Sequence, residues 1–105
     1  MTQFSVYRNK NARTKATFPL LVDVQSNLLE ELQTRVVIPL TKATALTRKP
    51  LDQLTPILKL EDEAYVLMTP QLAGIARKEL GAPSGTLVEH RDVILGAMDF
   101  LLTGF

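Results

Sequence analysis

The chain shows no recognisable arrangement of side chains for nucleophilic catalysis. It has no cysteine and one histidine, His90, so the partners that a catalytic triad or a zinc site would need are missing. His90 stands beside Arg91 at the start of an expected helix, and we interpret it as a surface or packing residue. The inventory favours a binding protein over an enzyme, with no metal and no cofactor. A ribonuclease that uses arginine and a hydroxyl stays open.

Two acidic features could hold a cation or a buried charge. Glu61, Asp62 and Glu63 are consecutive, but no ligand loop of recognisable spacing surrounds them, so we expect a solvated hairpin tip. Asp23 stands between two valines in a strand pattern. We expect its carboxylate on the opposite face of that strand from the valines, paired with a nearby arginine such as Arg35.

Four basic residues fall within eight positions near the N-terminus. They are Arg8, Lys10, Arg13 and Lys15. The segment is typical of a solvated loop, but it also offers complementary charge to an acidic partner. The formal net charge of the chain is only +1, which argues against bulk nucleic acid as a partner. We hypothesise that these four residues contribute to capture of an acidic peptide, with a plain solvated loop as the alternative.

Hydrophobic patterning predicts one mainly β domain over residues 1–105, closed by a helix. Expected strands cover residues 3–8, 20–25, 34–40, 57–60 and 64–69. Between them we expect a turn or helical piece at 27–33, a polar loop at 42–55, an ambiguous stretch at 72–80 and a break at 81–85. The first ten residues resemble no signal peptide, and no apolar run approaches the roughly 18 residues of a membrane span. With no cysteine, we expect a cytoplasmic protein without a membrane partner.

The expected C-terminal helix is unusually apolar. Thr86 and Glu89 match a capping box, which predicts a helix from there to Thr103. Its polar positions form one narrow stripe, spaced alternately by three and four residues: Glu89, Asp92, Gly96, Asp99 and Thr103. The remaining apolar span is wider than one sheet face can cover. We therefore expect a homodimer with Met98 near the two-fold axis, or else deep burial of the helix.

Several motifs of the chain resemble the CcdB family. They are Gln3–Tyr7, Leu21–Ser26, Arg35–Leu40, Asp62-Glu63 followed by Met68-Thr69, and His90-Arg91 followed by Ile94 and Ala97. The resemblance runs from end to end, while residues 9–19 and 75–85 match poorly. It implies a mainly β fold with a C-terminal α-helix, a small antiparallel barrel-like sheet of the CcdB/MazF type.

The resemblance also implies a function. CcdB proteins are plasmid-maintenance toxins of type II toxin–antitoxin systems that bind the A subunit of DNA gyrase and trap the gyrase–DNA cleavage complex. They are homodimers and not enzymes, and the disordered tail of a CcdA-like antitoxin neutralises them. We hypothesise that the basic residues near the N-terminus contribute to capture of this antitoxin: Arg8, Lys10, Arg13 and Lys15. No sequence-specific DNA binding is expected of the toxin alone. A MazF-like endoribonuclease on the same fold is the alternative.

The family's gyrase contacts fall at the chain end and after the second strand. By position they are Leu28, Leu29, Asp99, Leu102, Thr103, Gly104 and Phe105. The family's best-known ending is Trp-Gly-Ile, whereas this chain ends in Thr-Gly-Phe, so an aromatic anchor of the hot-spot type is lost. We hypothesise that Gly104 takes a left-handed conformation and that Phe105 supplies the aromatic surface instead.

Overall fold

The computed structural model describes residues 2–29, 31–47 and 49–104. The strands are β1 (Ser5–Asn9), β2 (Leu20–Asp23), β3 (Thr34–Lys42), β4 (Ile57–Leu60), β5 (Glu63–Leu67), β6 (Ala73–Ala76) and β7 (Leu80–Thr86), and the α-helix is α1 (Arg91–Thr103). One-turn 3-10 helices lie between them: η1 (Asn27–Leu29), η2 (Ala43–Ala45), η3 (Thr69–Gln71), η4 (Arg77–Glu79) and η5 (Val88–His90). None of these helices is long and apolar enough to cross a membrane.

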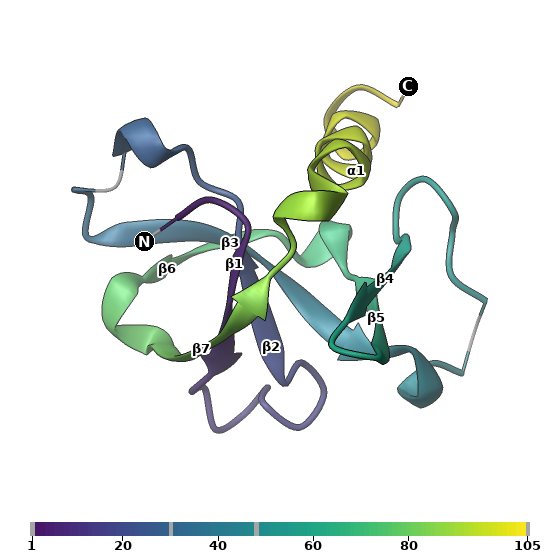
Figure 1. Ribbon diagram of the computed structural model, residues 1–105, viewed down its shortest axis with the longest axis horizontal. Helices are drawn as coiled ribbons and strands as arrows, with labels where there is room; N and C mark the ends of the chain where they lie inside the picture. Colours follow the sequence, from purple (N-terminus) through teal and green to yellow (C-terminus); the bar gives the residue numbers. More distant parts are fainter. Residues whose placement is uncertain (1, 30, 48, 105) are drawn as a thin grey trace.

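The strands form one curled antiparallel sheet in the order β4-β5-β3-β2-β1-β7, with β6 also paired to β3. Curvature comes from β3, whose first half pairs with β6 over Thr34–Val37 and whose second half pairs with β5 over Leu40–Lys42. Because one strand serves two partners along the same edge, the sheet bends into a half-barrel, and α1 lies across one of its open ends (Figure 1). The predicted mainly β fold with a C-terminal helix is confirmed.

Both faces of the central strands are buried. Val6, Val22 and Ile38 face the main core, which also receives Ile94 from α1. The alternate residues Tyr7, Leu21 and Val37 form a second cluster with Leu80 and the partly buried Ile75. The sequence predicts one buried face for the strand at 3–8, and that expectation is wrong because β6 and β7 supply apolar cover for the other face.

Asp23 and Arg35 form a fully buried ion pair, as the sequence predicts. The Arg35 Nη2 lies 2.6 Å from the Asp23 Oδ2, and both side chains are 0% exposed. The Arg35 Nε donates to the same oxygen at 2.9 Å, while the backbone N–H of Gln25 donates to the Asp23 Oδ1 at 3.0 Å. These bonds compensate part of the desolvation that burying two charges costs.

Three local expectations are wrong. Residues 81–85 are part of β7 and not a break, because Pro83 is tolerated in an edge strand whose pairing with β1 is irregular. The expected loop after the first strand begins too early: Arg8 lies in β1 opposite Leu20, as the strand at 3–8 predicts, and β1 continues to Asn9. The expected hairpin is present, and its tip places Glu61 and Asp62 at positive φ.

The third wrong expectation is the capping box at Thr86. The helix proper begins at Arg91, after the 3-10 turn η5, and no side chain caps it. The hydroxyl of Thr86 instead accepts a bond from the backbone N–H of Val88 at 3.2 Å. The hydroxyl also contacts the carbonyl oxygen of Phe4 at 3.5 Å. Thr86 therefore ties the entry of η5 to the first strand, and the predicted end of the helix at Thr103 is confirmed.

Candidate protein-binding surface

The C-terminal helix buries one side and exposes another. Ile94 and Ala97 are buried in the main core, and Leu95 and Met98 pack against that core while keeping part of their surface exposed. Three further apolar positions stay largely outside: Val93 is 45% exposed, Leu101 37% and Leu102 76%. The sheet therefore leaves part of the apolar helix uncovered, as its sequence pattern predicts.

The last turn of α1 is closed by Gly104. Its φ is 79°, in the left-handed region, and its N–H donates to the carbonyl oxygen of Phe100 at 2.9 Å. Glycine adopts this conformation without the steric cost that a side chain brings. The hydroxyl of Thr103 donates to the carbonyl oxygen of Asp99 at 2.7 Å, so this side chain is occupied by its own helix. The expected left-handed Gly104 is confirmed, while Phe105 lies outside the described residues.

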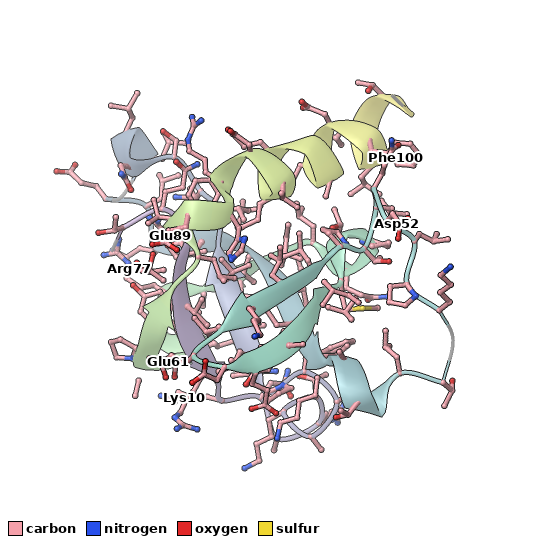
Figure 2. All side chains as sticks on the ribbon, turned by 45° about the vertical axis from the view of Figure 1, so that its right-hand side comes forward. Lys10, Asp52, Glu61, Arg77, Glu89 and Phe100 are labelled. Atoms are coloured by element: carbon pink, nitrogen blue, oxygen red, sulfur yellow. The ribbon has the colours of Figure 1, made fainter. Side chains whose placement is uncertain are left out.

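A shallow groove runs beside the helix. It has a volume of about 340 Å³ and is lined by Asp52 and Gln53 on one side and by Val93, Gly96 and Phe100 on the other. Figure 2 shows Asp52 and Phe100 on facing segments near the C-terminal end of the helix. A Cβ added at Gly96 would meet no atom within 4 Å, so the small residue leaves the groove open. Val93, Gly96 and Phe100 therefore border a groove that stays open between α1 and the segment at Asp52 and Gln53.

The turn η1 carries the other expected contact residues. Leu28 is 94% exposed and Leu29 50%. The side-chain amide of Gln25 donates to the carbonyl oxygen of Leu29 at 2.9 Å and its oxygen accepts from the N–H of Val36 at 3.0 Å. Gln25 thus connects η1 to β3 beside the buried Asp23. In Figure 1, η1 and the end of α1 project from well-separated parts of the molecule, so the expected gyrase contacts form two patches in one subunit.

A polar pocket of about 540 Å³ opens between β1, β3, the β4–β5 hairpin and β7. Its charged lining consists of Arg8, Lys42, Glu61 and Glu63, around the phenol of Tyr65. The Lys42 Nζ lies 3.4 Å from the Glu63 Oε1. The hydroxyl of Tyr65 donates to the Glu63 Oε2 at 3.4 Å.

The electrostatics of this pocket act on Tyr65. Desolvation raises the pKa of its phenol, and the charge of Glu63 raises it further, while Lys42 and Arg8 pull in the opposite direction. Both cations are therefore close enough to act on the hydroxyl. Sequence reasoning missed this site because Arg8, Lys42 and Tyr65 lie on three strands whose pairing is not visible in the spacing.

A family model described as "CcdB protein" matches residues 3–104. The chain belongs to the CcdB family. It is thereby a toxin of a toxin–antitoxin system. One similar solved structure is an endoribonuclease in complex with its cognate antitoxin from a mycobacterial species, with a TM-score of 0.74. The two chains share 18% identity, over 97% of this chain and 94% of that one, so this likeness shows the fold alone.

The four basic residues that we expect to contribute to antitoxin capture occupy different surroundings in this toxin. Arg8 lines the polar pocket, and the Lys10 Nζ donates to the carbonyl oxygen of Lys78 at 3.3 Å. Arg13 and Lys15 are exposed in the turns between β1 and β2. Of the four, Arg8 lines the polar pocket and Lys10 contacts the turn at Lys78, so the basic segment is not one uniform surface.

Proposed function

We propose that this CcdB-family toxin binds the A subunit of DNA gyrase and traps the gyrase–DNA cleavage complex, with no enzymatic activity of its own. The observation that carries the proposal is the exposed apolar end of α1. Leu102 is 76% exposed on a helix closed by a left-handed glycine. Large exposed apolar side chains on a rigid element are typical anchors of protein interfaces.

The proposal includes a homodimer built through the uncovered side of α1. In a single subunit Val93 is 45% exposed and Leu101 37%. A two-fold symmetric contact would bury both side chains in each of the two subunits. Met98 already packs against its own core, so it would contribute only its remaining surface. Sedimentation should show a dimer at micromolar concentration, and a monomer there would contradict this part of the proposal.

An antitoxin is the second partner that we propose. The solved endoribonuclease of the same fold is bound to its cognate antitoxin, and the family belongs to toxin–antitoxin systems. A disordered antitoxin tail that wraps the toxin would cover a large surface. Degradation of the antitoxin would then release the toxin. The basic residues of the β1–β2 connection, Arg13 and Lys15, are free to accelerate association with an acidic tail.

The test of the gyrase proposal uses purified toxin, gyrase and supercoiled plasmid. We expect linear DNA to accumulate once the trapped complex is denatured and digested with protease. Removing residues 104 and 105, or changing Leu102→Ser, should weaken poisoning strongly, while Thr103→Ala should have a small effect because its hydroxyl bonds within the helix. Lys15→Gln is the control, because Lys15 is exposed and far in sequence from the end of α1. This variant should poison gyrase as the natural chain does.

The same preparation tests the MazF-like endoribonuclease alternative. Incubation with RNA in the absence of gyrase should leave the RNA intact. RNA cleavage without gyrase, together with no cleavage complex in its presence, would overturn the proposal in favour of the nuclease. Support for the nuclease at present is the shared fold at 18% identity.

A further inference from the structure

The polar pocket lies where the half-barrel fails to close. β4 and β7 are the two ends of the sheet order, and they approach each other at Leu60 and Gly85. A Cβ added at Gly85 would lie 3.1 Å from the Leu60 Cδ1. The pocket opens beside this contact, with Leu60 and Glu61 from the hairpin on one side and Pro83 and Ser84 from β7 on the other. We call this site the seam pocket.

The two cations of the seam pocket, Arg8 and Lys42, differ in how they are paired. In residues 2–29, 31–47 and 49–104, no carboxylate lies within ion-pair distance of Arg8. Lys42 meets Glu63 at 3.4 Å, but the two side chains are 51% and 47% exposed. A pair this open contributes at most about 1 kcal/mol and is easily exchanged for another partner. The seam pocket therefore offers one free guanidinium and one loosely held ammonium.

The hairpin tip beside the pocket is strained. Glu61 has φ 49° and Asp62 has φ 68°, both in the left-handed region. Two-residue hairpins of this kind strongly favour asparagine, aspartate and glycine, and a glutamate there costs energy that the surrounding structure must offset. Strain of this type concentrates at binding sites. Here it holds the carboxylate of Glu61 at the rim of the seam pocket.

We propose that the seam pocket binds an acidic side chain from an extended segment of the antitoxin, with Arg8 as the main partner of its carboxylate. Lys42 supports the same carboxylate after exchange with Glu63. Glu61 and Glu63 then meet a basic residue of the same segment on the opposite wall. The choice of the antitoxin as the source of this segment rests on the proposed function, whereas recognition of the acidic peptide does not.

The mixture of charges favours a peptide over a nucleic acid. Glu61, Asp62 and Glu63 stand together at the hairpin, and a nucleic-acid strand carries a negative charge at every phosphate. Such a strand would be repelled along one wall while it is attracted to the other. A peptide can alternate acidic and basic side chains and match both walls.

The probe is the blocked tripeptide acetyl-Glu-Ser-Lys-amide, titrated into isotopically labelled toxin and followed by NMR. We expect shifts concentrated at Arg8, Lys42 and Tyr65, with weak affinity, and much smaller shifts with acetyl-Gln-Ser-Lys-amide. Arg8→Gln should weaken binding about tenfold, since a charge-assisted hydrogen bond to a carboxylate is lost. Arg13→Gln removes the same charge from an exposed turn and should change affinity by less than about twofold.

Three outcomes would overturn the inference. They are shifts scattered away from the pocket, equal losses for Arg8→Gln and Arg13→Gln, and tighter binding of a short oligouridylate than of the peptide. Thermal unfolding of each variant checks that the fold is kept. Because the readout is peptide binding by the toxin alone, a failure to poison gyrase would leave this result standing. A failure here would likewise leave the gyrase proposal standing.

Discussion

Two ion pairs of similar chemistry stand in opposite surroundings in this toxin. Asp23 and Arg35 are both 0% exposed and joined at 2.6 Å, whereas Lys42 and Glu63 are about half exposed and 3.4 Å apart. Water competes for the second pair but not for the first. The buried pair therefore has a structural role. The exposed pair lines a pocket and can exchange its partners for a ligand.

Breaking the buried pair should have the largest effect on stability. Asp23→Leu leaves an uncompensated buried guanidinium, so the free energy of unfolding should fall by about 3–5 kcal/mol. The double change Asp23→Leu with Arg35→Met should recover much of that loss, because neither charge then has to be desolvated. Denaturant unfolding of the three proteins measures this. A double variant no more stable than the single one would show that the pair itself is strongly stabilising.

The neighbour of the buried pair, Gln25, should show a smaller effect with a functional consequence. Gln25→Leu removes the bonds to Leu29 and Val36 and leaves the partly buried N–H of Val36 without its acceptor, at a cost of about 1–2 kcal/mol. We expect η1 to loosen, which amide hydrogen exchange at residues 27–29 would reveal. If Leu28 and Leu29 contact gyrase, binding measured by calorimetry should weaken as well. Unchanged exchange would mean that η1 is held by other contacts.

The exposed pair should barely matter for stability. Lys42→Gln or Glu63→Gln should change the free energy of unfolding by less than about 1 kcal/mol, and added salt should reduce even that difference. The two variants should differ in ligand binding, since Glu63→Gln frees Lys42 for an acidic peptide and Lys42→Gln removes it. A loss of stability comparable with that of Asp23→Leu would show that the exposed pair is as important for the fold as the buried pair.

The smallest expected effect is on the pH dependence of stability at alkaline pH, and it comes from Tyr65. Its pKa is raised above the ordinary 10.0, so the folded chain holds the phenol proton more tightly than the unfolded chain does. That contribution is complete below pH 10 and is lost as the pH rises through the raised value. Tyr65→Phe should therefore unfold with a weaker dependence on pH above about pH 10 than the natural chain. Identical pH dependence would show that the phenol is not desolvated.

Several features of the fold were predictable from local pattern. The hairpin expected from strands at 57–60 and 64–69 is present as β4 and β5. The pairing of Asp23 with Arg35 and the end of α1 before a left-handed Gly104 also match expectation. Each depends on residues close in sequence or on adjacent strands, where spacing determines which side chains share a face. The uncovered apolar side of α1 was visible in the same way, from its narrow polar stripe.

The predictions that were wrong concern residues whose structure depends on packing or pairing with segments distant in sequence. A Gly-Ala-Pro-Ser-Gly run is typical of a break, yet pairing with β1 draws it into β7. Tyr7 is buried because Leu80 and Ile75 arrive from the far half of the chain. Thr86 satisfies a capping pattern, but its position at the end of β7 ties it to Phe4 and Val88 instead.

The sequence by itself determined the class of fold, the faces of most strands, the apolar helix end and membership of the CcdB family, because these are properties of local periodicity and motif. Tertiary structure alone decided the seam pocket. Arg8, Lys42 and Tyr65 are far apart along the chain and acquire a common environment only when β3 pairs with two strands and the sheet curls. Charge positions in a closed sheet follow from register and curvature, and neither is written in the spacing of single residues.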